Sequence, residues 1–167
     1  ILLVGDSAGM VMLGYENTAP VTMDQMCMFT EAVSNGRQNA LIVADLPNKS
    51  YENEIDAVSN SERLINAGAD AVKLEGRLPD VIRAIVKAGI PVMGHLGLLP
   101  QTAKKYTVQG KTEADAEILF SDAKALQEAG VFSIVLEMVT SEATKKITET
   151  VSVPTIGIGC GQDCDGQ

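Results

Sequence analysis

Six short apolar runs are spaced along the chain, each bounded by glycine or proline. They occupy residues 1–7, 40–47, 70–76, 90–97, 132–138 and 153–161. Runs of this length and composition are typical of strands that are buried on both faces of a parallel sheet. The pattern therefore predicts six buried strands.

Stretches with helical periodicity lie between most of these runs, and their first residues suit helix starts. Thr22, Thr112 and Ser141 suit the N-cap position of a helix, and Pro79 suits the first turn. The helices that begin at these residues are expected over about 22–34, 78–89, 112–130 and 142–151.

Three helical stretches end in Ala-Gly directly before a strand, with Gly68, Gly89 and Gly130 as the glycines. Glycine enters the left-handed backbone region at no steric cost, so it commonly follows the last helical residue. Short helix-to-strand turns repeated in this way indicate an α/β array with parallel strands in one domain over residues 1–167.

Polar residues stand at the carboxyl end of five successive runs. They are Asp6, Asp45, Lys73 with Glu75, His95, and Glu137. Residues two apart in a strand point to the same face of the sheet. Val4 should therefore lie on the same face as Asp6, and Val135 on the same face as Glu137. In an open doubly wound sheet these groups would be strung along an edge, whereas in a (β/α)₈ TIM barrel they converge on one mouth. This convergence favours the barrel.

A single aspartate after a strand is more often a helix cap or turn residue than a ligand. Asp6, Asp45 and Glu75 together would repel one another unless protons or a cation neutralise them. Hard oxygen ligands in small number, with room for water and substrate, suit Mg²⁺. In this reading Lys73 faces a substrate anion, and its attraction to Glu75 lowers the cost of burying either group.

Composition narrows the class of protein further. The 167 residues are 46% hydrophobic and 21% charged, with a net charge of −9 and no basic cluster, which argues against nucleic acid or an anionic membrane as a partner. No apolar run is long enough to span a membrane. Three cysteines, Cys27, Cys160 and Cys164, are too few for a disulfide framework, and with one histidine they make a poor zinc site. We expect a cytoplasmic protein.

The chain begins at Ile1 inside an apolar run and stops at Gln167 without a closing element. We therefore expect it to be a piece of a longer protein.

Several longer motifs, read in order, resemble the ketopantoate hydroxymethyltransferase (3-methyl-2-oxobutanoate hydroxymethyltransferase) family. They are "ILLVGDSAGMVMLGYENTAPVTMDQM", "VADLPNKSY", "AVKLEG", "IPVMGHLGLLPQT", "YTVQGKTEADAEILFSDAKALQEAG" and "VPTIGIGCGQDCDGQ". The resemblance implies a Mg²⁺-dependent (β/α)₈ barrel enzyme of pantothenate synthesis. Such an enzyme transfers a hydroxymethyl group from 5,10-methylenetetrahydrofolate to 3-methyl-2-oxobutanoate, giving 2-dehydropantoate and tetrahydrofolate.

The resemblance also implies roles for particular residues. The metal site would comprise Asp6, Asp45 and Glu75. The keto acid would lie against Ser7, Asp45, Lys73 and His95. Glu137 would be the catalytic base. It further implies that this chain covers about strands two to seven of the barrel, without the first strand and its helix or the eighth strand and its helices. Such a piece is expected to be inactive alone. The whole protein is expected to be a homo-oligomer, which is a decamer in the family.

The proposed chemistry calls for these residue types independently of the resemblance. Removing a proton beside a ketone leaves an enolate, and a divalent cation chelated by carboxylate and keto oxygens stabilises that charge. Two alternatives stay open: another Mg²⁺-dependent barrel of the phosphoenolpyruvate or pyruvate type that acts on an α-keto acid, and a non-catalytic, degenerate barrel.

Overall fold

The computed structural model describes all residues, 1–167, and contains six strands and six helices. The strands are β1 (Leu2–Val4), β2 (Ile42–Asp45), β3 (Ala71–Lys73), β4 (Val92–Gly97), β5 (Ser133–Glu137) and β6 (Thr155–Ile158). The helices are α1 (Ala8–Leu13), α2 (Met23–Gly36), α3 (Glu54–Asn66), α4 (Pro79–Lys87), α5 (Glu113–Ala129) and α6 (Ser141–Thr150). All six expected strands are confirmed, while α1 and the start of α3 were not anticipated.

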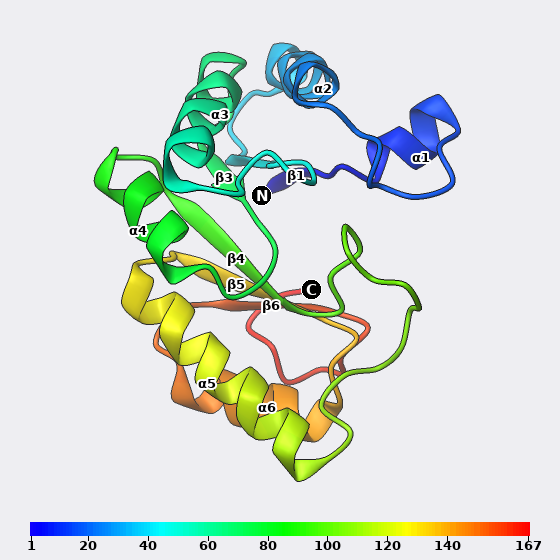
Figure 1. Cartoon of the computed structure of the whole chain (residues 1–167), viewed down its shortest axis with the longest axis vertical. Helices are drawn as coiled ribbons and strands as arrows, with labels where there is room; N and C mark the ends of the chain where they lie inside the picture. Colours follow the sequence, from blue (N-terminus) through cyan, green and yellow to red (C-terminus); the bar gives the residue numbers. More distant parts are fainter.

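The six strands form one parallel sheet in the order β1-β2-β3-β4-β5-β6. Helices α2 to α6 lie in an arc around this sheet, and α1 projects away from it (Figure 1). A doubly wound sheet reverses its strand order at a switch point and carries helices on both faces. The sequential order and the arc of helices instead match successive β/α units of a barrel, with β1 and β6 at the two edges.

The helix ends follow the signals in the sequence, with one correction. Thr22 forms a reciprocal capping box with Gln25, and Thr112 accepts a hydrogen bond from the Asp115 amide. Pro79 begins α4, and Gly68, Gly89 and Gly130 all have positive φ. Ser141, however, is the first helical residue of α6, and Thr140 occupies the N-cap position.

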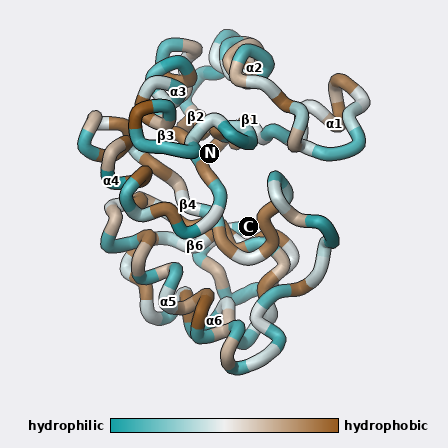
Figure 2. The backbone as a smooth tube through the Cα atoms, in the orientation of Figure 1, coloured by the Kyte–Doolittle hydropathy of each residue, from teal (hydrophilic) through white to brown (hydrophobic).

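The sheet separates two apolar clusters. The larger one lies between the strands and the helices and includes Ile42, Val72, Leu136 and residues of α2 to α6. The smaller one contains only Val43, Ala71, Met93 and Val135 among buried residues, one from each of four neighbouring strands. Residues of one sheet face alternate with those of the other, so this small cluster defines the inner face. Teal and brown segments alternate along α5 and α6, as expected of helices with one buried face (Figure 2).

Two residues after the inner cluster, Asp45, Lys73, His95 and Glu137 continue the same face at the strand ends. In the first strand the expectation that Val4 and Asp6 share a face is wrong. Val4 belongs to the helix-side core, and Leu3 faces the inner side with the polar residues. Because β1 ends at Val4 and the chain turns at Asp6, Asp6 reaches the inner side without sharing a strand face with Val4.

No helix is both long enough and apolar enough to cross a membrane.

Candidate active site

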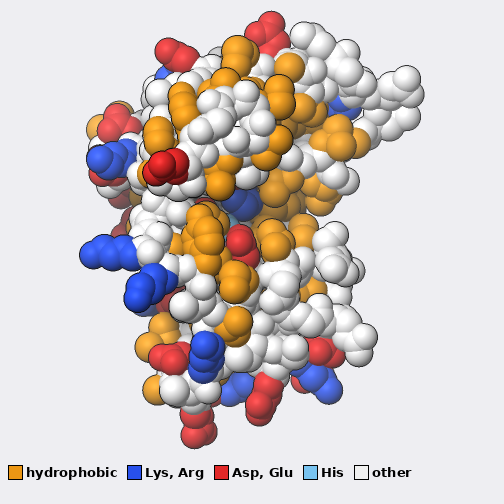
Figure 3. Space-filling view, turned by 90° about the vertical axis from the view of Figure 1, so that its right-hand side faces the viewer, with side chains coloured by type: hydrophobic (Ala, Val, Ile, Leu, Met, Phe, Trp, Pro, Cys, Tyr) orange, Lys and Arg blue, Asp and Glu red, His pale blue; other side chains and the backbone are white.

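Every residue for which the sequence predicts a site role lines one pocket at the carboxyl ends of the strands. The pocket has a volume of about 360 Å³ and contains Asp6, Ser7, Asp45, Lys73, Glu75, His95 and Glu137. Hydrophobic side chains, among them Leu3, Met10, Leu98 and Ile158, form part of its wall. In the view of this side, acidic and basic side chains lie in a hollow surrounded by hydrophobic ones (Figure 3).

Lys73 and Asp45 form a buried ion pair at the centre of the site. Lys73 Nζ lies 2.6 Å from Asp45 Oδ1, and both side chains are about 95% buried. Burial alone would lower the pKa of Lys73, but the charge and hydrogen bond of Asp45, with help from Glu75 and Asp6, raise it above its ordinary value. Lys73 is therefore a fixed positive charge. Removing one member of such a pair leaves the other uncompensated, at a cost of about 3–5 kcal/mol.

Asp6 and Glu75, the carboxyl groups beside this ion pair, have raised pKa values. Burial, and then the charge of Asp45, raises the pKa of Asp6 to about 6. Burial raises the pKa of Glu75 to about 8, although Lys73 opposes the shift. Asp45 Oδ2 also accepts a hydrogen bond from the Asp6 amide at 3.0 Å. These carboxylates are crowded enough that added positive charge would be favoured.

His95 lies between two carboxylates. Its Nε2 is 3.2 Å from Glu137 Oε2, and its Nδ1 is 3.7 Å from Glu75 Oε1, but neither nitrogen makes an aligned hydrogen bond. Burial lowers the pKa of His95, so its imidazole is neutral at pH 7. Glu137 keeps about a fifth of its side chain exposed to the pocket. A partly shielded carboxylate beside a neutral imidazole can accept a proton from a bound molecule.

Sequence reasoning missed three residues of this site. Gln101 is buried and donates to Asp6 Oδ2 at 2.8 Å, and the Tyr51 hydroxyl donates to Gln101 Oε1. Thr18 lines the pocket with a buried hydroxyl that has no hydrogen-bond partner. All three lie in loops, outside the strand ends that drew attention to the other residues. The only available signal was that the motifs "ENTAP", "PNKSY" and "LLPQT" carry polar residues soon after strands or the first short helix.

The carboxylates fit a partly hydrated cation better than a complete protein cage. Nowhere do three His, Cys, Asp or Glu side chains gather closely enough to enclose a metal ion by themselves. Mg²⁺ usually keeps several waters and binds through one or two carboxylates together with substrate oxygens. Asp6 and Asp45, which lie at the carboxyl ends of the neighbouring strands β1 and β2 and line the same pocket, fit that mode, with Glu75 beside them.

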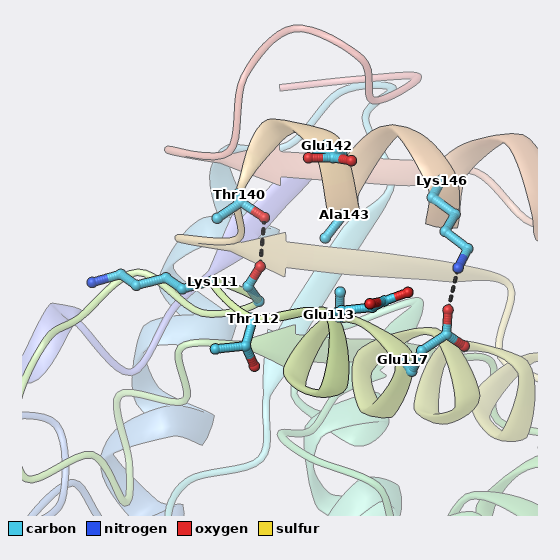
Figure 4. Close-up of a pocket in the computed structure, with 10 residues that line it drawn as sticks. Lys111, Thr112, Glu113, Glu117, Thr140, Glu142, Ala143 and Lys146 are labelled. Atoms are coloured by element: carbon cyan, nitrogen blue, oxygen red, sulfur yellow. Dashed lines mark hydrogen bonds and ion pairs between the residues drawn. The ribbon is translucent and has the colours of Figure 1, made fainter.

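A second pocket, of about 350 Å³, lies between the amino-terminal ends of α5 and α6 (Figure 4). Thr140 Oγ1 donates to the Gly110 carbonyl at 2.9 Å, and Lys146 pairs with Glu117. Lys111 points away from the other labelled side chains. The pocket shares no lining residue with the carboxylate pocket, and its charged side chains are solvent-exposed. It contains none of the predicted site residues.

Solved structures that resemble this chain support the barrel architecture. A 2,3-dimethylmalate lyase, described as a PEP mutase/isocitrate lyase superfamily member, is 19% identical with a TM-score of 0.70, covering 93% of this chain and 58% of that one. A phosphoenolpyruvate phosphomutase from Streptomyces platensis subsp. rosaceus is 13% identical with a TM-score of 0.70, covering 93% and 60%. At such identities the likeness concerns the fold alone. The expected barrel class is confirmed as six parallel strands of a half-barrel.

Curated relatives match along the whole chain. A 3-methyl-2-oxobutanoate hydroxymethyltransferase of Nitrosopumilus maritimus is 66% identical over 173 residues, covering 100% of this chain and 62% of the relative. One of Cenarchaeum symbiosum is 60% identical, covering 100% and 66%. The chain thus spans just under two thirds of the length of these relatives. The family model for ketopantoate hydroxymethyltransferase matches residues 1–167. The chain belongs to the ketopantoate hydroxymethyltransferase family.

Proposed function

We propose that the protein to which this chain belongs transfers a hydroxymethyl group from 5,10-methylenetetrahydrofolate to 3-methyl-2-oxobutanoate. The observation that carries the proposal is the convergence, in one pocket, of a buried lysine, clustered carboxylates and a carboxylate beside a neutral histidine. Family membership along all 167 residues supports the choice of reaction. With one water, these substrates give 2-dehydropantoate and tetrahydrofolate.

Binding of the keto acid begins with its carboxylate. Lys73 is the buried positive charge in the pocket, and Ser7 supplies a hydroxyl that makes no cap hydrogen bond to α1. A charge-assisted hydrogen bond from an ammonium group is roughly twice as strong as a neutral one. These two residues therefore fix one end of the substrate and orient its C3 hydrogen within the pocket.

Glu137 removes that hydrogen as a proton. The electron pair left behind is shared between C3 and the keto oxygen. Water adds to the methylene carbon of the folate, the bonds from that carbon to the folate nitrogens break as the nitrogens take up protons, and tetrahydrofolate is left. C3 then bonds to the released one-carbon unit, whose oxygen, supplied by the water, takes a proton and becomes the hydroxyl. His95 is neutral and its Nε2 lies 3.2 Å from the Glu137 carboxylate, so after a small rotation it can accept a hydrogen bond from Glu137 once that group is protonated. The hydrophobic side chains of Leu98 and Ile158 lower the polarity of the pocket wall, which strengthens these interactions.

Asp6 and Asp45, with Glu75 directly or through water, would hold Mg²⁺. When bound there, the ion would supply positive charge beside the keto oxygen. The raised pKa values of Asp6 and Glu75 fit this assignment, because crowded, desolvated carboxylates are stabilised by a cation.

We further infer a homo-oligomeric, cytoplasmic enzyme. The exposed apolar side chains of α1, Met10 to Leu13, suit a protein interface, and all three cysteines are free thiols, as is usual in a reducing compartment.

The test is an assay of the full-length protein with 3-methyl-2-oxobutanoate, 5,10-methylenetetrahydrofolate and Mg²⁺, followed by mass spectrometry of the products. We expect a product heavier than the keto acid by one CH₂O unit. Phosphonopyruvate and 2,3-dimethylmalate serve as comparison substrates. Absence of the hydroxymethyl product, or turnover of a comparison substrate instead, would overturn the proposal.

A further inference from the structure

Gln101 occupies an unusual place for an uncharged loop residue. It lies in the long connection from β4 to α5, yet its side chain is only 5% exposed and reaches into the carboxylate site. Its Nε2 donates to Asp6 Oδ2 at 2.8 Å and to the Leu46 carbonyl at 2.9 Å. Its backbone amide donates to Glu75 Oε2 at 3.2 Å.

These contacts determine the orientation of the amide. A carboxylate and a carbonyl only accept hydrogen bonds, so Nε2 must face Asp6 and Leu46. Oε1 then faces Tyr51, whose hydroxyl donates to it and lies 3.4 Å from the Glu75 amide. Every polar atom of the Gln101 side chain has a partner, and the residue links the loops that follow β1, β2, β3 and β4.

We infer that Gln101 is a positioning residue that holds Asp6 and Glu75 ready for a divalent cation and thereby couples the loop of residues 98–110 to cation binding. The Gln101 side-chain amide engages one oxygen of Asp6, and its backbone amide, held in place by the side chain, engages one oxygen of Glu75, so both carboxylates are restrained. Partners that orient ligands in this way commonly change metal affinity about 10- to 100-fold. The inference rests on the proposed Mg²⁺ site.

The same contacts tie the loop to the site. Beyond Gln101 the loop contains Lys104 and Lys105, both exposed, which are cleavage sites for trypsin. A cation that stabilises the positions of Asp6 and Glu75 also favours the Gln101 contacts, because binding and ordering are linked. Mg²⁺ is therefore expected to slow cleavage at these lysines.

The test uses the full-length enzyme without substrates and Mg²⁺ alone as the probe. Gln101→Met removes the amide at similar length, and Gln109→Met is the matched control, because the Gln109 side chain bonds only to Thr107 in the same loop. Calorimetric titration should show about tenfold weaker Mg²⁺ binding in Gln101→Met and parent affinity in Gln109→Met. Trypsin cleavage at Lys104 and Lys105 should slow with Mg²⁺ in the parent and the control but not in Gln101→Met.

Tyr51→Phe provides a second variant in case Gln101→Met does not fold. It removes the hydroxyl that fixes the amide from its other side and should weaken Mg²⁺ binding by a smaller factor, about two- to fivefold. Parent affinity and parent protection in Gln101→Met, or in Tyr51→Phe where only that variant folds, would overturn the inference and leave the proposed function intact. A parent enzyme that does not bind Mg²⁺ would overturn both the metal assignment and this inference.

Discussion

At the scale of single residues, the proposed base can be separated from the groups that bind substrate. Glu137 ends β5 beside neutral His95, and Lys73 and Ser7 lie elsewhere in the same pocket. Glu137→Gln keeps the size of the side chain but cannot accept the proton. We expect exchange of the C3 hydrogen of 3-methyl-2-oxobutanoate with deuterated solvent to fall by about 10²–10⁴-fold in the full-length enzyme, with keto-acid binding nearly unchanged.

Proton NMR of the exchange and calorimetry of keto-acid binding measure the two effects. Glu142→Gln is the matched control, since Glu142 is exposed on α6 and lies outside the carboxylate pocket. Exchange at the parent rate in Glu137→Gln would remove Glu137 from the role of base.

The residues that sequence reasoning placed correctly share one property: they lie at or just beyond the carboxyl ends of buried strands. Parallel strands bring their carboxyl ends to one side, so Asp45, Lys73 and His95 had to meet once the strands were recognised. Thr18 lines the pocket and Gln101 contacts its Asp6 through loops whose paths depend on tertiary contacts, such as the hydrogen bond from Gln101 to Asp6. No local pattern encodes such a path.

At the scale of elements, the junction of β4 and β5 depends on one glycine. Gly97 ends β4 with φ of +93°, and a Cβ there would lie 2.2 Å from the Glu137 carbonyl oxygen. Gly97→Ala therefore combines backbone strain with a clash against the residue that carries the proposed base. We expect the free energy of unfolding of the full-length protein to fall by more than about 2 kcal/mol, with a loss of turnover.

Gly89→Ala is the matched control for Gly97→Ala. Gly89 also has positive φ, at +84°, but a Cβ there would meet nothing within 4 Å. Gly89→Ala should therefore lower the free energy of unfolding by only about 1 kcal/mol, the cost of the backbone strain, and should retain activity. Denaturant unfolding and the transfer assay compare the two variants, and equal losses in both would contradict a specific role for the β4–β5 contact.

The start of β2 and the segment before β3 are joined by Asp70. Its Oδ2 accepts a hydrogen bond from the Ile42 amide at 2.8 Å and pairs with Arg37. These hydrogen bonds lower the pKa of Asp70. A carboxyl group whose pKa is lower in the folded than in the unfolded protein stabilises the fold at pH values above its unfolded-state pKa, which is about 3.9 for aspartate. This stabilisation is lost as the pH falls from there toward the folded-state pKa.

We expect Asp70→Asn to lower the free energy of unfolding of the full-length protein by about 1 kcal/mol at pH 7. The Asp70 side chain is about one third exposed, so the ion pair with Arg37 contributes only a small part of this free energy. The difference from the parent should shrink toward about pH 3. Urea unfolding at both pH values measures it, with Asp163→Asn, at an exposed position, as the control. A difference that stays constant with pH would show that the charge of Asp70 does not contribute.

At the scale of the whole molecule, the order of the strands and the barrel class could be predicted from the sequence. The Ala-Gly ends of the helices indicated short returns to parallel strands, and the structure has such returns at Gly68, Gly89 and Gly130. The helix α1 could not be predicted. Its six residues, Ala8–Leu13, are mostly apolar and mostly exposed, so they lack the amphipathic period that reveals a helix packed on a core.

That exposed helix leads to a prediction about the behaviour of the molecule in solution. Single exposed apolar residues are normal, whereas a contiguous apolar patch usually contacts another protein. Met10 to Leu13 are four consecutive exposed apolar residues, and Met10 lines the same pocket as exposed Leu3 of β1. We expect the 167-residue chain, expressed by itself, to self-associate and to lack transfer activity.

Size-exclusion chromatography with light scattering measures this association. Replacing Val11 and Met12, which are 82% and 70% exposed, by serine should shift the chain toward the monomer, because it removes the most accessible part of the patch. Ile55→Ser is the matched control: Ile55 is 81% exposed, but it lies on α3 away from α1 and has no exposed apolar neighbour in sequence. Its replacement should leave the association unchanged. A monomeric parent chain with a cooperative thermal transition, or equal effects of both sets of substitutions, would show that the α1 patch does not drive contact between molecules.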